Sequence, residues 1–210
     1  DRGWLALEAV GIADEIRKNA IPMYNRVMHD IEGNITKQPY GKDNQAIWSV
    51  SRSGINEQLI SMAEAEANCN VHFRHHLTDL NFDDCNARFD HDGEQVQHKS
   101  DLVIGADGAF SKVRRLAQEL PKKRVSYSME YMPQSYMELS FPAGENGSFN
   151  MEKNALHIWP RKNFMLIALP NPDGSFTGTL FMDHEGELSF KSLNTKEKVS
   201  EFFHTYFPDA

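Results

Sequence analysis

The stretch DLVIGADGAFSKVRR, residues 101–115, constrains the fold most. Its apolar run at 102–104 is typical of a short strand that is covered on both faces, as in a parallel sheet. The glycines that follow keep the next turn narrow, and Ser111 is placed to cap a helix starting near residue 112. Open α/β sheets bind ligands at the carboxyl ends of their strands, where this turn is predicted. Asp107 is therefore either a ligand contact or the residue that forms the turn.

Charge and hydropathy exclude several classes of protein. The chain has 22 Lys and Arg residues and 30 Asp and Glu residues, which gives a formal net charge of −8. Without a basic stripe, such a chain is a poor binder of nucleic acid, and no apolar segment approaches the roughly 20 residues that span a bilayer. Cys69 and Cys85 lack any metal-type spacing, so we expect two free thiols in a reducing cytoplasm. Because the chain starts with Asp1 and both ends look cut, we expect a piece of a longer protein.

Hydrophobic periodicity predicts an α/β first part and a β-rich second part. In the first part, residues 3–20 and 53–68 have helical spacing, with Gly11 interrupting the former. Alternating segments predict strands at 45–52, 71–84 and 87–100, and a β-hairpin at about 21–41. In the second part, strands are expected at 135–143, 155–161, 163–170 and 175–184, and a helix at 196–207. We therefore predict two domains, residues 1–120 with the hairpin inserted and residues 121–210, an antiparallel sheet that ends in a helix.

Several segments together resemble one enzyme family. DLVIGADGAFSKVR is similar to the Asp-Gly motif of the class A flavoprotein aromatic hydroxylases, which contacts FAD and the nicotinamide cofactor. IPMYNRVMH, QPYG, IWSVSR and residues 137–181 resemble the members of that family that act on kynurenine. The resemblance runs along essentially all 210 residues.

The resemblance implies both a fold and a reaction. The fold would be part of a glutathione-reductase-like FAD-binding domain joined to an antiparallel substrate-binding sheet. The reaction would be hydroxylation of L-kynurenine at ring position 3 in tryptophan catabolism, with FAD, NADPH and O2, in the cytoplasm. The flavin would supply the chemistry, so neither a catalytic side chain nor a metal ligand is expected. A homodimer is left open.

The family's substrate residues fall on matching positions of this sequence. Arg26 matches the arginine that binds the substrate carboxylate, and Tyr40 matches the tyrosine that adds a hydroxyl donor to it. Without the resemblance, both would be interpreted as exposed hairpin residues. The apolar wall around the substrate ring matches Ile47, Leu156, Met165, Ile167, Leu169 and Phe181. Three of these alternate along one strand, but a plain sheet core predicts the same alternation.

Four further positions match residues that contact FAD. Arg52 matches an arginine at the start of a helix, for which a solvent-exposed helix residue is the alternative. Asp107 and Gly108 match the motif near the ribityl chain and the pyrophosphate. Direct contact between Asp107 and phosphate would be repulsive, so hydroxyls, backbone or water would mediate it. Arg114 would fix the turn.

Other parts of the family pattern are missing from the sequence. The glycine-rich G-x-G-x-x-G loop, the ribose-binding acid, the later Gly-Asp segment and the C-terminal closing helices are all absent. We therefore expect this chain alone to bind FAD weakly or not at all. Two alternatives stay open: a related hydroxylase acting on another aromatic acid, and a non-catalytic module that binds the substrate.

Overall fold

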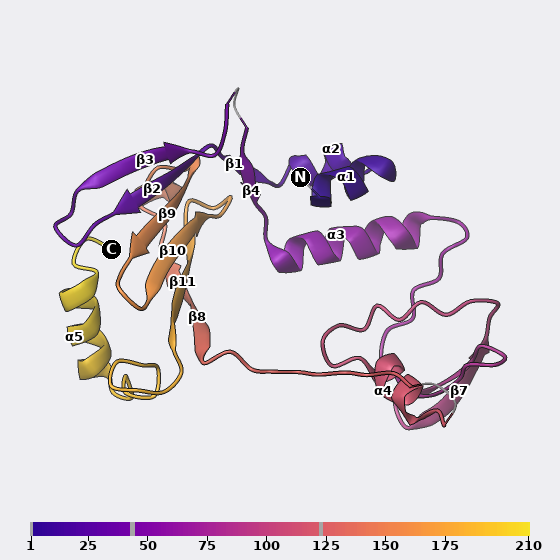
Figure 1. Cartoon of the computed structure of the whole chain (residues 1–210). Helices are drawn as coiled ribbons and strands as arrows, with labels where there is room; N and C mark the ends of the chain where they lie inside the picture. Colours follow the sequence, from indigo (N-terminus) through magenta and orange to yellow (C-terminus); the bar gives the residue numbers. More distant parts are fainter. Residues whose placement is uncertain (1, 43–44, 122–123) are drawn as a thin grey trace. The chain divides into compact units, whose positions relative to one another are not determined.

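Two compact units make up the computed structural model, which describes residues 2–42, 45–121 and 124–210 (Figure 1). Asp1–Leu59 and Tyr131–Ala210 form the first unit, and Ile60–Glu130 forms the second. The first unit therefore combines the two ends of the chain, and the second is one continuous segment.

The N-terminal part of the first unit consists of short elements. They are α1 (Arg2–Ala9), α2 (Ala13–Arg17), β1 (Ile21–Met23), β4 (Ile47–Ser49) and α3 (Arg52–Ala65), the last of which continues into the second unit. Gly11 separates α1 from α2 with a φ of 75°, as the sequence predicts, because glycine adopts this left-handed conformation readily. β1 and β4 form an antiparallel pair. On α3, the apolar residues Ile55, Leu59, Ile60, Met62 and Ala63 are half-buried, and no residue of this helix is fully buried.

A six-stranded sheet forms the rest of the first unit, in the order β3-β2-β9-β10-β11-β8 (Figure 1). Its strands are β2 (Asn25–His29), β3 (Ile35–Pro39), β8 (Gln134–Phe141), β9 (Ala155–Pro160), β10 (Met165–Pro170) and β11 (Phe176–Asp183). A 3-10 turn, η1 (Glu145–Gly147), lies between β8 and β9. All pairs in this sheet are antiparallel except β2 and β9, which run parallel.

One face of this sheet is the hydrophobic core of the unit. Along β11, alternate residues from Phe176 to Met182 are buried, and β10 and β9 contribute Leu166 and Trp159 in the same way. The helix α5 (Lys196–Tyr206) covers this face with Phe202. On the opposite face, the described side chains of β9 and β10 are half-buried or exposed.

The second unit contains a three-stranded antiparallel sheet and one helix. The sheet pairs β5 (His75–Asn81), β6 (Asn86–His91) and β7 (Glu94–Lys99), and the helix is α4 (Lys112–Glu119). Asp92 and Gly93 form the turn between β6 and β7 with φ values of 53° and 93°, the left-handed region that such hairpin turns require. Leu80, Ala87 and Leu116 form a small core between sheet and helix.

The predicted strand at 102–104 is wrong. This segment has no strand, and Leu102 and Ile104 are 72% and 79% exposed. A strand needs a neighbour to pair with, and β5, β6 and β7 pair only with one another among the described residues. Of the residues 102–104, only Val103 packs against the small core of Leu80, Ala87 and Leu116.

The hairpin predicted within the first domain belongs to the sheet of the first unit, where β2 pairs with β9. The sheet predicted for residues 121–210 is therefore mixed, because it includes this parallel pair. A compact unit is not the same thing as a domain, so the predicted division at residue 120 stays a prediction.

Candidate functional site

Strand register brings Arg26 and most of the predicted apolar wall to one face of the six-stranded sheet. Arg26 is the Cα partner of Leu156, and Met165 is the Cα partner of Phe181. Residues paired in this way point to the same side of a sheet. Ile167 and Leu169 follow Met165 by two and four residues on β10 and share its side.

This face, which we call the open face, lies opposite the core. It carries Arg26, Leu156, Met165, Ile167, Leu169 and Phe181, and none of them is buried. The alternate residues Leu166 and Ala168 are fully buried on the other face. An uncovered face with a guanidinium at one side and apolar side chains beside it suits a ligand with a carboxylate and an aromatic ring.

Arg26 and Tyr40 lie together at this face. The Cζ atom of Arg26 stands 4.5 Å from the centre of the Tyr40 ring, a cation–π geometry. The backbone N–H of Tyr40 donates to the Tyr24 carbonyl oxygen at 2.9 Å, which fixes the ring beside β2. Within the described residues, the Arg26 guanidinium forms no hydrogen bond or ion pair, so its donors are free to bind an anion.

Ile47 and Arg52 lie elsewhere in the first unit. Ile47 belongs to β4, which pairs with β1 and not with the large sheet. It lines an apolar hollow of about 270 Å³ together with Trp4 and Trp48. Arg52 is the exposed first residue of α3, where Ser51 caps the helix by accepting a bond from the Gly54 N–H at 3.1 Å. The structure does not bring Ile47 onto the open face.

Asp107 caps the helix α4. Its Oδ1 accepts from the Ser111 hydroxyl at 2.6 Å, and its Oδ2 accepts from the N–H groups of Lys112 and Val113 at 2.7 and 3.1 Å. The Ser111 hydroxyl bond, followed by these N–H bonds, lowers the pKa of Asp107 to about 2. Ser111 is the N-cap, as predicted, and its Oγ accepts from the Arg114 N–H at 3.0 Å.

Gly108 and Arg114 complete this turn. Gly108 has a φ of 75°, which glycine adopts at little cost. The guanidinium of Arg114 donates to the Ala109 carbonyl oxygen and lies 4.0 Å from the centre of the Tyr127 ring. Arg114 therefore fixes the turn, by binding its backbone rather than Asp107.

A hollow of about 700 Å³ adjoins this turn in the second unit. Its lining includes Asp107, Lys112 and Arg115, together with apolar side chains of β5, β6 and the 103–106 segment. A hollow with both charged and apolar walls fits a part of a dinucleotide cofactor, which has an aromatic system and anionic phosphates. Asp107, Gly108 and Arg114 would hold that group by fixing the turn.

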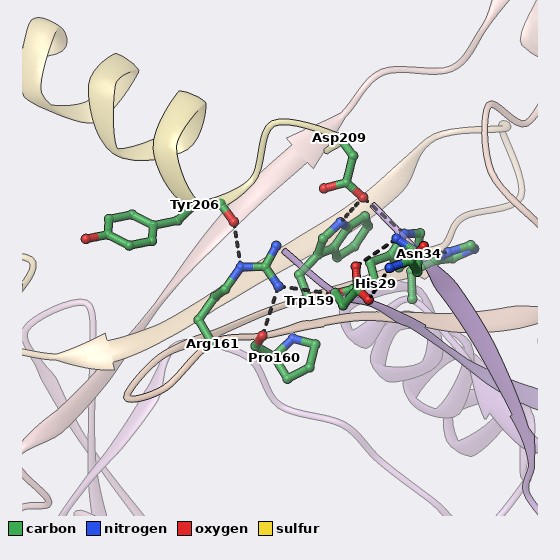
Figure 2. A network of polar contacts seen from close by, with 9 residues as sticks. His29, Asn34, Trp159, Pro160, Arg161, Tyr206 and Asp209 are labelled. Atoms are coloured by element: carbon green, nitrogen blue, oxygen red, sulfur yellow. Dashed lines mark hydrogen bonds and ion pairs between the residues drawn. The ribbon is translucent and has the colours of Figure 1, made fainter. Parts of the chain in front are cut away.

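Sequence reasoning missed a polar network on the core side of the sheet. His29 and His157 are 6% and 2% exposed, and their rings form a hydrogen bond of 3.0 Å between Nε2 and Nδ1. Beside them, Asp209 accepts a hydrogen bond from the Trp159 indole N–H, and Arg161 donates one to the His29 carbonyl oxygen (Figure 2). Alternation along β2 and β9 could have placed both histidines in the core, but no local pattern pairs two strands so distant in the chain.

Among the described residues, no group of three His, Cys, Asp or Glu side chains is arranged to hold a metal ion. None of the helices in the described ranges combines the length and the apolar character that a bilayer crossing requires.

A family profile described as an FAD binding domain matches residues 5–171, so the chain belongs to this FAD-binding family. Along its whole length the chain is 42% identical to the kynurenine 3-monooxygenase of Flavobacterium johnsoniae, of which it covers 47%. It is 43% identical to that of Myxococcus xanthus, with 45% covered, and 42% identical to that of Sus scrofa, with 43% covered. The family resemblance predicted from the sequence is confirmed, and the chain spans about half the length of the curated relatives it matches.

Solved structures share the fold at much lower identity. A variant of Pseudomonas aeruginosa PqsL is 14% identical, with a TM-score of 0.74, and the match covers 99% of this chain and 55% of that one. Klebsiella pneumoniae HpxO complexed with FAD and uric acid is 15% identical, with a TM-score of 0.68 and 98% and 50% covered. At this identity the likeness concerns the fold alone.

Proposed function

We propose that this chain belongs to an enzyme that hydroxylates L-kynurenine to 3-hydroxykynurenine and consumes NADPH and O2. The observation that carries the proposal is the register of β2 and β9, which sets the free guanidinium of Arg26 beside Leu156 on an uncovered apolar face. The names of the relatives, kynurenine 3-monooxygenases over the whole chain, support the same substrate. The reaction would lie in tryptophan catabolism, since kynurenine is a product of tryptophan breakdown.

In this proposal, Arg26 binds the substrate carboxylate in two charge-assisted hydrogen bonds. Tyr40 supports the guanidinium with its ring and adds a hydroxyl donor. Leu156, Ile167 and Leu169 contact the aromatic end, because they lie on the strands nearest to Arg26. Met165 lies further off because it is four residues from Leu169 along β10, and Phe181 is its Cα partner on β11, the third strand from β2. Ile47 stays a substrate contact predicted from the sequence, on β4 and outside this face.

FAD would bind in the second unit and would supply the oxygen chemistry when bound, and Arg52 stays an FAD contact predicted from the sequence. Asp107, Gly108 and Arg114 would hold the turn that faces it. The support for this assignment is the FAD-binding family and the capped turn beside the 700 Å³ hollow. The glutathione-reductase-like architecture, the domain division at residue 120, the cytoplasmic location and the homodimer remain predictions from the sequence.

Product analysis tests the proposal. The protein expressed from its complete gene is incubated with L-kynurenine, NADPH and O2, and the products are identified by mass spectrometry. We expect 3-hydroxykynurenine in a one-to-one ratio with oxidised NADPH. The Arg26→Met variant should bind kynurenine about 30- to 1000-fold more weakly, because it loses a charged, hydrogen-bonded contact of about 2–4 kcal/mol.

Two results would contradict the proposal. Turnover of another aromatic acid in preference to kynurenine would favour a related hydroxylase. Binding of kynurenine without any NADPH oxidation would favour a non-catalytic module.

A further inference from the structure

The seam between β2 and β9 lacks the usual devices that fix strand register. It is the parallel pair of the six-stranded sheet, and it joins Asn25–Met28 to Ala155–Ile158. The antiparallel pairs β2–β3, β9–β10 and β10–β11 are joined by short connections that help to set their register, whereas β2 and β9 are far apart in the sequence. Parallel pairing is also slightly less stable per residue. Side-chain contacts across the seam must therefore help to align these two strands. Besides the buried histidines, the Asn154 amide donates to the Pro22 carbonyl oxygen and the Arg161 guanidinium donates to the His29 carbonyl oxygen.

The hydrophobic pattern excludes only some of the wrong alignments. A slip of one residue would turn Arg26 into the core and His29 out of it, which burial forbids. A slip of two residues keeps every side chain on its face and moves β2 along β9 by about 6.6 Å. Arg26 would then lie beside Ile158 rather than Leu156, on a face that is apolar at both positions. Apolar packing does not distinguish these two alignments.

The two buried histidines do distinguish them. His29 Nε2 and His157 Nδ1 are 3.0 Å apart in the observed alignment. His157 Nε2 lies 3.0 Å from the Glu152 carbonyl oxygen, so it carries the hydrogen and leaves Nδ1 as the acceptor for His29. A two-residue slip would separate the rings and leave polar atoms of both histidines buried without partners, which is costly.

Counting protons shows that this bond persists in the neutral form of the pair. The two rings make three contacts that each require one hydrogen: with Glu152, with each other, and with Asp209. Two neutral imidazoles supply only two hydrogens. The contact left without one is the longest, at 3.3 Å between His29 Nδ1 and Asp209 Oδ2. Asp209 is held there by the Trp159 indole N–H at 3.0 Å instead (Figure 2).

We propose that the hydrogen bond between His29 and His157 sets the register of β2 on β9, and that the two histidines are thereby positioning residues for Arg26. The claim about register stands on the geometry of the sheet alone. Its consequence for the substrate carboxylate rests on the proposed function.

Disulfide trapping tests the register directly. In a protein with Cys69 and Cys85 replaced by serine, Met28→Cys with Ile158→Cys reports the observed alignment, because these positions are Cα partners. Met28→Cys with Pro160→Cys reports the two-residue slip, because Met28 lies beside Pro160 when Arg26 lies beside Ile158. A disulfide needs Cα atoms about 4.4–6.8 Å apart, so each cysteine pair traps one alignment. Each pair is oxidised in the protein expressed from its complete gene, and the disulfide yields are compared.

We expect the observed alignment to dominate in the parent. Replacing both histidines by leucine removes both rings of the pair, so neither ring is left without the other; the Glu152 carbonyl oxygen loses its donor, and Asp209 keeps the Trp159 N–H. The slipped disulfide should then gain yield at the expense of the other. Trp159→Phe is the matched control, since it removes a buried polar contact on the same face of β9 and spares the histidine bond. An unchanged ratio in the double leucine variant, or an equal shift in the control, would overturn the inference.

Enzyme kinetics test the consequence for Arg26. In the double leucine variant, the KM for L-kynurenine should rise on the order of 30-fold or more, because the guanidinium no longer meets the carboxylate. The KM for the decarboxylated amine analogue should stay constant. A shifted disulfide ratio with an unchanged KM would overturn the positioning role. A parent that does not hydroxylate kynurenine would contradict the proposed function, and the disulfide ratio would still decide the register.

Discussion

The geometry of Arg26 and Tyr40 predicts that the ring of Tyr40 matters as well as its hydroxyl. The guanidinium lies 4.5 Å from the ring centre at a site open to solvent, where a cation–π contact is worth about 0.5–1 kcal/mol. The hydroxyl adds about 0.5–1.5 kcal/mol if it donates to the substrate carboxylate. Tyr40→Phe removes only the hydroxyl and should weaken kynurenine binding roughly 2- to 12-fold. Tyr40→Leu removes both contributions and should weaken binding roughly 5- to 60-fold.

Equilibrium titration of the FAD-loaded protein with L-kynurenine measures these dissociation constants. A double-mutant cycle with Arg26→Met isolates the contact between the two side chains, and we expect a coupling of about 0.5–1 kcal/mol. The backbone bond from Tyr40 to Tyr24 persists in every variant, so local folding should be preserved. Equal losses for Tyr40→Phe and Tyr40→Leu, or strictly additive effects with Arg26→Met, would refute the reasoning.

Three further outcomes are expected. Burial is the main cause that lowers the pKa values of His29 and His157 below 6.5, so the folded state favours their neutral forms. The free energy of unfolding should therefore fall as the pH falls from about 7 to about 5. Urea titrations should show a smaller fall in the double leucine variant. Asp107→Ala should increase hydrogen exchange in the first turn of α4 at neutral pH, and a rate equal to that of the parent would argue against capping. Gly174→Ala should destabilise the protein more than Gly33→Ala. Both positions have φ near 90°, which costs an alanine about 1–2 kcal/mol, but of the two only Gly174 has a backbone carbonyl where the new Cβ would lie, which adds about 1–3 kcal/mol. Chemical denaturation measures both losses.

Local chemistry was predictable from the sequence wherever neighbouring residues decide it. Ser111 caps α4 and Gly11 divides the first two helices, because cap and turn preferences act over a few residues. The failure at 102–104 has the opposite cause. That run has the composition of a buried strand, but a strand also needs a partner, which local composition does not specify.

The open face shows the same limit. Met165 and Leu166 belong to two alternating sets on β10, and both sets are apolar, so periodicity alone does not decide which of them is the core. The set with Leu166 is the core because Phe202 of α5 packs on that side of the sheet. The buried bond between His29 and His157 was beyond local reasoning as well, since it joins strands more than a hundred residues apart.

The two interpretations that the sequence left open for Asp107, turn former or ligand contact, can be reconciled by counting its acceptor sites. A carboxylate offers about four lone-pair sites on its two oxygens. Among the described residues, Oδ2 accepts two N–H bonds and Oδ1 accepts one bond, from the Ser111 hydroxyl, so one site on Oδ1 remains. Because its pKa is about 2, Asp107 stays ionised and can only accept. The group that it can still bind is therefore a hydroxyl or an N–H, and a phosphate would have to bind to the backbone of the turn instead.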